Sequence, residues 1–246
     1  MRLSKIDTKA PGSFDKEATK EKTQELLNTL KDLQDIFYAQ KKYSLLVILQ
    51  GLDASGKDGA IKKVFSGVNP MGCTVKPFKV PTSEEMAHDF LWRIHQHVPA
   101  KGMIQIFNRS HYEDVLVPKV EKFLSDAVIK KRYAHINSFE QLLTDAGTII
   151  LKFFLYVSEE EQMGRIQERI TNPKKHWKYD PSDLTTTQKR DIYLEAYEDV
   201  FEHCSPQLPW HIVPADQNWY KEYIIAKTLV ETLQNLNLKY PERVNE

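Results

Sequence analysis

The sequence predicts an α/β protein of three layers, in which helices cover both faces of a mostly parallel sheet of about five strands. The first observation behind this prediction is that apolar, strand-like runs alternate with amphipathic helical segments from residue 45 onward, which is typical of parallel sheets. The second is a glycine-bounded loop at 51–58 that joins one such run to a helix. A chain of 246 residues can bury a substantial core, and we expect one domain over 1–246.

The first 42 residues are expected to form an arm and a helix ahead of the sheet. Residues 1–13 lack periodicity and contain Pro11-Gly12, so we expect an arm that packs either along the body or against a partner. From Asp15 to about Lys42, apolar residues recur at helical spacing, which predicts one long amphipathic helix. Its single apolar face fits its own sheet and another subunit equally well.

Short apolar runs bounded by turn residues predict the strands. The nearly continuous apolar run from Thr148 to Val157 suits a central parallel strand. The mixed run from Cys73 to Val80, which contains Pro77, suits an edge strand. Strands are expected at 45–49, 73–80, 102–107, 148–157 and 209–215.

Helical spacing and capping residues predict the helices between these strands. Thr82 or Ser83 caps a helix that Pro99 stops, and Ser158 caps another with an acidic first turn. Gly147 ends the helix before the 148–157 strand. Beyond the helix that follows residue 58, helices are expected at about 82–97, 121–133, 138–145, 158–170, 186–203 and 218–236.

Composition excludes several classes of function. A hydrophobic content of 41% and a charged content of 28% are typical of globular proteins. The formal net charge is zero, so no global field attracts nucleic acid or a membrane surface. The N-terminus has no apolar signal core, no window resembles a membrane span, and the two cysteines show no metal spacing. We therefore expect a cytoplasmic protein that binds neither nucleic acid nor membranes.

The loop at 51–58 has the spacing of a P-loop. Two glycines with four residues between them let backbone N–H groups turn toward a phosphate, while the following helix and the Lys57 ammonium attract the anion. An ordinary strand-to-helix turn is the alternative. The residues expected to bind phosphate here are Gly51, Ala54, Ser55, Gly56, Lys57, Asp58 and Gly59.

Two carboxylates make this loop unusual. An ordinary P-loop has Ser or Thr after the lysine to bind magnesium, but this chain has Asp58, and it adds Asp53 within the loop. A carboxylate beside a polyanion is repelled unless a cation lies between them, so Asp53 is a candidate Mg²⁺ ligand. Asp58 fits either a metal site or the dipole of the helix that it begins.

Polar residues follow the strand expected at 102–107. Ligands of parallel sheets bind beyond the carboxyl ends of the strands, and Asn108 lies where P-loop kinases present a polar residue to the metal. Arg109 would point its guanidinium at the phosphates. The alternative for Arg109 is a surface ion pair with Glu113 or Asp114.

A basic segment at about 165–190 is expected to be a lid. Seven basic and three acidic residues lie between Arg165 and Arg190, and two prolines interrupt the middle. A lid that closes cations over phosphates fits this pattern, and a solvated loop is the alternative. Arg169 shares a helix face with Arg165, and Lys174 and Lys175 are expected to bind phosphate.

Three motifs together resemble the polyphosphate kinase 2 family: GLDASGKDG at 51–59, FNRSHYED at 107–114 and ERITNPKKHWK at 168–178. The resemblance implies a thymidylate-kinase-like P-loop fold with a helical lid. It also implies reversible phosphoryl transfer from inorganic polyphosphate to nucleotides, with Mg²⁺ or in its place Mn²⁺, in a homo-dimer or homo-tetramer. By motif, Asp53 and Asn108 would serve the metal, and Lys57 and Arg109 would hold the transferring phosphate. Arg169 would reach in from the lid.

The chain departs from the family pattern at two places. Many members have Asp where this chain has Asn108, and an amide is a weaker magnesium ligand. Members specialised for nucleoside diphosphates tend to have Asn-Arg where this chain has Glu113-Asp114. The acidic pair resembles class III, which phosphorylates both AMP and ADP. We therefore expect Glu113 and Asp114 to contact the nucleotide, with AMP, ADP and ATP as substrates or products and guanine nucleotides left open.

The mechanism expected is direct in-line transfer without a phosphoenzyme, with cations supplying most of the catalysis. The alternative is an ATP-dependent nucleotide kinase of similar fold. A non-catalytic regulator that binds polyphosphate or nucleotide is a third hypothesis, and the presence of Lys57, Arg109 and Arg169 argues against it.

Overall fold

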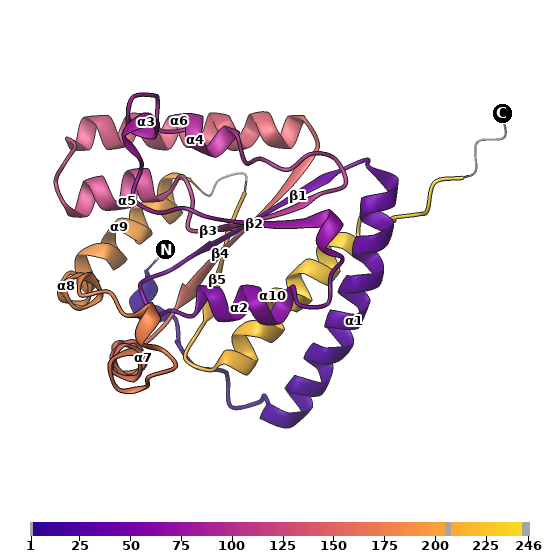
Figure 1. The fold of residues 1–246 in the computed structure, drawn as a ribbon, viewed down its shortest axis with the longest axis horizontal. Coiled ribbons are helices and arrows are strands. Elements are labelled where there is room, and N and C mark those ends of the chain that lie inside the picture. The colour runs from indigo at the N-terminus through magenta and orange to yellow at the C-terminus, as the bar shows by residue number, and fades with distance from the viewer. Residues whose placement is uncertain (1, 205–207, 243–246) are drawn as a thin grey trace.

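A five-stranded parallel sheet organises the protein (Figure 1). The computed structural model describes residues 2–204 and 208–242, without the side chains of 182 and 183. Within these residues the strand order is β2-β3-β1-β4-β5 and all four pairings are parallel. The strands are β1 (Ser44–Gln50), β2 (Cys73–Pro77), β3 (Ile104–Asn108), β4 (Thr148–Tyr156) and β5 (Trp210–Pro214).

The sheet separates two hydrophobic cores. Every residue of β1 is buried, because this strand lies at the centre and alternate side chains enter opposite cores. Leu46 and Ile48 enter one core, whereas Leu45, Val47 and Leu49 enter the other. The predicted central character of β4 and the edge position of β2 are confirmed.

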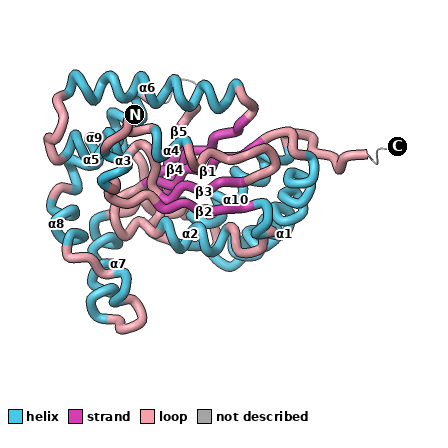
Figure 2. The backbone as a smooth tube through the Cα atoms, turned by 45° about the horizontal axis from the view of Figure 1, so that its top comes forward, coloured by secondary structure: helices cyan, strands magenta, loops and turns pink. Residues whose placement is uncertain are grey.

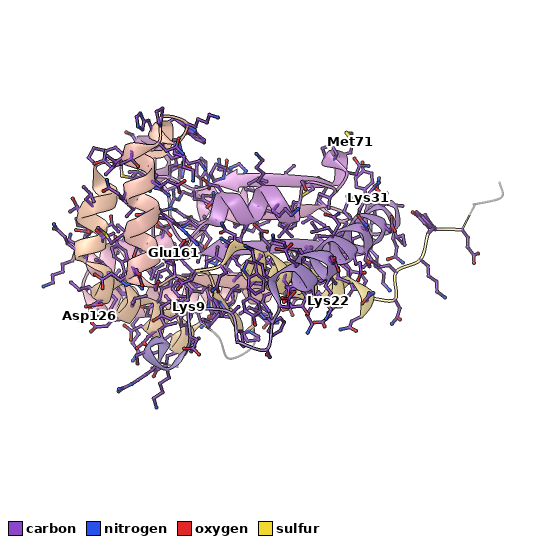
Figure 3. All side chains as sticks on the ribbon, turned by 90° about the horizontal axis from the view of Figure 1, so that it is seen from below. Lys9, Lys22, Lys31, Met71, Asp126 and Glu161 are labelled. Carbon is purple, nitrogen blue, oxygen red and sulfur yellow. The ribbon has the colours of Figure 1, made fainter. Side chains whose placement is uncertain are left out.

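Helices cover both faces, which confirms the three predicted layers (Figures 1 and 2). One face carries α1 (Lys16–Gln40), α2 (Lys57–Val64) and α10 (Asn218–Gln234), and the other carries α5 (Glu113–Val120), α6 (Asp126–Asp145) and α9 (Arg190–His203). Exposed lysines such as Lys22 and Lys31 lie along α1 (Figure 3). Among the described residues, no helix combines the length and the apolar composition needed to cross a membrane.

The single helix predicted at 82–97 is wrong, because the structure has two short helices there. α3 (Ser83–Met86) begins with the predicted cap, since Thr82 and Glu85 bond reciprocally. α4 (Trp92–His95) follows a break at Asp89, whose carboxylate accepts hydrogen bonds from the backbone N–H groups of Leu91 and Trp92. A side chain that satisfies these N–H groups competes with continuous helix.

Three other helix predictions have wrong bounds. The sequence did not predict α5, which begins at Glu113 and ends before Lys122, a residue with a left-handed φ of 57°. The helices predicted at 121–133 and 138–145 are one helix, α6, because its buried face continues past Ser138. The helix predicted at 186–203 is divided into α8 (Ser182–Gln188) and α9.

The N-terminal arm packs along the body of the same chain. A short 3₁₀ helix, η1 (Leu3–Lys5), buries Leu3 to 1% exposure, and the Leu3 N–H donates to Glu198. The Thr8 hydroxyl donates to Asp216 at 2.8 Å. These contacts hold the arm on α9 and on the turn after β5.

Candidate active site

The P-loop and the end of β3 lie side by side at the carboxyl edge of the sheet. β1 ends at Gln50, and α2 begins at Lys57. In the β1–β3 register Leu49 faces Asn108, and the Arg109 N–H donates to the Leu49 carbonyl at 3.0 Å. The topology therefore brings together two of the three motifs at the edge where parallel sheets bind ligands.

Two glycines give the P-loop its path. Gly56 has a φ of 93°, and a Cβ there would lie 2.3 Å from Lys221 Nζ. Gly51 has a φ of 150°, and a Cβ there would lie 2.8 Å from the Leu155 carbonyl oxygen. The loop therefore favours glycine at both positions for backbone conformation, and at Gly51 also for space, because the neighbouring atom there belongs to the backbone.

Side-chain donors from three helices hold the carbonyls of the P-loop. The bonds are Lys57 Nζ to Gly51 O (2.7 Å) and Leu52 O (3.1 Å), Gln162 Nε2 to Asp53 O (3.0 Å), Arg165 Nη1 to Ala54 O (3.0 Å) and Lys221 Nζ to Gly56 O (3.3 Å). Carbonyl oxygens repel anions, so a loop whose carbonyls are engaged elsewhere is better suited to phosphate.

Two buried lysines raise the positive potential at the loop. Burial, assisted by the charge of Arg109, lowers the pKa of Lys57 to about 8. Burial and the charge of Arg165 likewise lower the pKa of Lys221 to about 8. Crowded, desolvated cations favour a polyanion, because its charge relieves their mutual repulsion.

Arg109 joins the P-loop to the start of α5. Its Nη1 donates to Glu113 Oε2 at 3.0 Å, and its Nη2 forms an ion pair with Asp53 Oδ1. The negative charge of Glu113, followed by that of Asp53, outweighs burial and raises the pKa of Arg109. The ion pair with Glu113 was the alternative to a role of Arg109 at the phosphates; the structure contains that pair together with the contact to Asp53, and the role at the phosphates stays a prediction.

Asn108 and Asp58 meet across the two motifs. Asn108 Nδ2 donates to Asp58 Oδ1 at 2.8 Å, while Asp58 Oδ2 lies 3.7 Å from Lys178 Nζ. Asp58 thus links the start of α2 to the end of β3 and to the basic segment. Sequence reasoning did not single out Lys178, although it belongs to the third motif.

The basic segment at about 165–190 begins within α7 (Glu159–Thr171) and continues through η3 (His176–Lys178) and α8, beyond the lower left of the sheet in Figure 2. Arg169 Nη1 donates to the Lys178 carbonyl at 3.4 Å. Lys175 pairs with Glu168 at 2.6 Å, and the Lys174 N–H donates to Asn172. The Lys175 ammonium is therefore held within the segment, and the contact to the P-loop helix is made by Lys178.

The acidic pair at the start of α5 points in two directions. Glu113 faces Arg109, as described above. Asp114 pairs with the buried Arg93 of α4 at 2.9 Å, and its backbone carbonyl accepts from Arg132. Burial raises the pKa of Asp114, against the opposing charge of Arg93. The structure therefore brings Glu113 to the P-loop and holds Asp114 against α4.

Comparison with known proteins identifies the family. Residues 13–241 match the model of polyphosphate kinase 2. The chain is 47% identical over 245 residues to an AMP/ADP-polyphosphate phosphotransferase from Meiothermus ruber, covering 98% of this chain and 92% of that protein. It is 41% identical over 257 residues to an ADP-polyphosphate phosphotransferase from Rhodopseudomonas palustris, covering 98% and 88%.

A solved structure agrees with these sequence matches. The crystal structure of polyphosphate kinase 2 from Arthrobacter aurescens TC1 superposes with a TM-score of 0.96 at 39% identity, covering 100% of this chain and 89% of that chain. The similarity extends over the P-loop, the end of β3 and the basic segment alike. This protein belongs to the polyphosphate kinase 2 family.

Proposed function

We propose that the protein transfers the terminal phosphoryl group of inorganic polyphosphate to AMP and to ADP, reversibly. The observation that carries this proposal is the near full-length similarity to the Meiothermus ruber protein, which is named for both acceptors. The Rhodopseudomonas palustris relative is named for ADP alone and is less similar. The greater similarity to the dual-acceptor relative is the reason to include AMP.

The cations around the P-loop support direct in-line transfer. Phosphoryl transfer places charge on the equatorial oxygens of a loose transition state, so positioning and positive charge supply most of the catalysis. Lys57 and Arg109 would hold the transferring group at the loop, and Arg169 would approach it from the lid. With these three cations in place, the reaction needs no phosphoenzyme.

Mg²⁺, or Mn²⁺ in its place, is the cofactor in this proposal. The oxygen atoms of Asp53, Asp58 and Asn108 near the loop are the donors that a hard cation prefers. In the part of the chain that the structure describes, no group of three His, Cys, Asp or Glu side chains could hold a metal alone. Substrate phosphates would therefore complete its coordination, which is common for Mg²⁺. The bound ion would neutralise charge on the phosphate oxygens.

Two broader parts of the proposal concern partners. The first is assembly as a homo-dimer or homo-tetramer, which is what the family resemblance implies. Guanine nucleotides are a second class of acceptor, since a Corynebacterium glutamicum relative, 28% identical over 92% of this chain and 70% of its own length, is named a putative GDP-polyphosphate phosphotransferase.

A donor comparison tests the proposed function. Purified protein with Mg²⁺ and AMP is supplied with either long-chain polyphosphate or ATP, and nucleotides are separated by chromatography. We expect ADP to form from polyphosphate. ADP formed only with ATP would instead establish an ATP-dependent nucleotide kinase. Tight polyphosphate binding without turnover of AMP or ADP would indicate a regulator.

A further inference from the structure

A hydrogen-bond chain connects the P-loop to Gln162 and Arg190, which lie at either end of the basic segment predicted as a lid at about 165–190. Gln162, on the first turn of α7, donates from Nε2 to the Asp53 carbonyl at 3.0 Å. Its Oε1 accepts from Arg190 Nη1 at 2.5 Å, and Arg190 Nη2 donates to the Val157 carbonyl at 2.6 Å. Gln162 lies three residues before the predicted lid, and Arg190 is its last residue.

The donor and acceptor roles along these hydrogen bonds can be assigned in only one way. An arginine guanidinium has donors and no acceptor, so it fixes the Gln162 amide with Oε1 toward Arg190. The amide nitrogen must then face the Asp53 carbonyl. Gln162 is 1% exposed and Arg190 is 8% exposed, so solvent does not compete freely for either side chain, and burial strengthens the bonds between them.

The hydrogen-bond chain ends at the Asp53 carbonyl, within the P-loop that is proposed to hold the transferring phosphoryl group. The peptide group held by Gln162 belongs to Asp53, whose carboxylate pairs with Arg109. A rotation of that peptide would displace both the carboxylate and the neighbouring N–H groups of the loop. Displacements of about 1 Å at a reacting centre can cost about 10²-fold in rate.

We propose that Gln162 and Arg190 are positioning residues for phosphoryl transfer. Arg190 sets the orientation of the Gln162 amide, and Gln162 holds the Asp53 peptide in the conformation that the P-loop uses. This inference rests on the proposed function, because its readout is transfer from polyphosphate. Neither side chain touches the transferring group, since both act through the loop.

The experiment compares variants that change the donor without changing size. Gln162→Glu keeps the acceptor for Arg190 but faces the Asp53 carbonyl with a second acceptor, and Gln162→Met removes both bonds at similar volume. The matched controls are Gln167→Glu and Gln167→Met, which make the same changes at an exposed position of the same helix. Each protein is assayed for kcat and for KM of polyphosphate and AMP, and thermal unfolding reports the folded fraction.

We expect both Gln162 variants to lower kcat roughly 10- to 100-fold per folded molecule, with KM values changed less than about threefold. The controls should stay within about twofold of the unaltered enzyme. Arg190→Lys, which keeps one of the two donations, should retain more activity than Arg190→Met. The double variant Gln162→Met/Arg190→Met should be no worse than the poorer single variant, because both act through the same carbonyl.

Four outcomes would overturn the inference. Folded Gln162 variants with normal kcat would show that the hydrogen bonds of Gln162 do not position the P-loop for transfer. Losses of activity that only follow the folded fraction would show the same. Losses that multiply in the double variant would show that the two residues act independently. An unaltered enzyme that transfers no phosphoryl group from polyphosphate would overturn the proposed function itself, and with it the positioning role of Gln162 and Arg190.

Discussion

Lys152→Met tests the role of the buried ion pair between Lys152 and Glu140, which contacts Tyr112 of the 107–114 motif. Lys152 is 0% exposed and Glu140 is 2% exposed. Lys152 Nζ donates to Glu140 Oε2 at 2.7 Å, to the Tyr112 hydroxyl at 3.0 Å and to the Cys204 carbonyl at 2.8 Å. Burial disfavours ionised Glu140, but the hydrogen bond from His111 and the charge of Lys152 outweigh it and lower the pKa of Glu140.

Methionine in place of Lys152 fills similar space but leaves the Glu140 carboxylate without its cation. Removing one partner of a buried pair costs about 3–5 kcal/mol. Because 1 kcal/mol shifts Tm by about 2–4 °C in a chain of this size, we expect Tm to fall by roughly 6–20 °C. Lys152→Met/Glu140→Gln removes both charges and keeps an acceptor for Tyr112, so it should recover at least half of the loss.

Thermal unfolding followed by circular dichroism measures the fall in Tm. Urea unfolding measures the loss in free energy of unfolding, together with the slope of the transition. Lys22→Met, the same substitution at an exposed position of α1, should change stability by less than about 0.5 kcal/mol. A loss below about 1 kcal/mol for Lys152→Met would refute the reasoning. So would a double variant whose loss equals the sum of the losses measured for Lys152→Met and for Glu140→Gln alone, because the pair would then be uncoupled.

Four further predictions concern catalysis and pH. The pKa of Lys57 is about 8 in the protein without substrate. Because Lys57 loses its positive charge above that pH, kcat/KM should fall as pH rises through about 8. Lys57→Arg keeps a charge at this position at every pH tested, so the fall in kcat/KM above pH 8 should disappear if Lys57 causes it. The fall should remain if Lys221 causes it. Arg169→Ala should lower kcat about 10³- to 10⁵-fold in a folded protein, and near-normal turnover would remove Arg169 from the mechanism. Asp53→Asn should raise the Mg²⁺ concentration for half-maximal rate roughly tenfold, and an unchanged magnesium titration would exclude Asp53 as a ligand. Because the folded-state pKa of Glu140 lies below its ordinary 4.5, its contribution is complete above about 4.5 and is lost as pH falls through the lower folded value; urea midpoints between pH 3 and 6 measure this loss.

The layers and strands could be predicted because burial on two faces leaves a continuous apolar pattern in sequence. β1 and β4 are of this kind. The helix bounds failed where a local polar group decides the outcome. Asp89 caps a new helix in what reads as one apolar face, and Ser138 lies on the exposed side of α6 although serine is typical of helix starts.

The centre of the site was predictable because its residues lie within short motifs on neighbouring strands. Lys57, Arg109 and Asp53 come together through the β1–β3 pairing alone. The supporting residues were not predictable, because their contacts span long separations. Gln162 reaches the loop from 109 residues away, and Lys221 reaches it from 165 residues away.

The acidic pair shows the same limit at a smaller scale. Glu113 and Asp114 are adjacent in sequence, and the family resemblance assigns both to the nucleotide. A helix turns by about 100° per residue, so neighbours on α5 point to different surroundings. Arg93, which holds Asp114, lies in the segment whose helices were predicted incorrectly. Contact between Asp114 and the nucleotide stays a prediction from the family resemblance.

The most direct test is a time course of adenine nucleotides formed from long-chain polyphosphate and AMP with Mg²⁺, for the unaltered protein beside Lys57→Met. We predict that ADP forms first and ATP follows, and that the variant forms neither at a comparable rate although it remains folded. No ADP or ATP from the unaltered protein, with AMP or with ADP as acceptor, would contradict the account. Equal rates from the folded Lys57→Met variant would show that transfer does not occur at the P-loop.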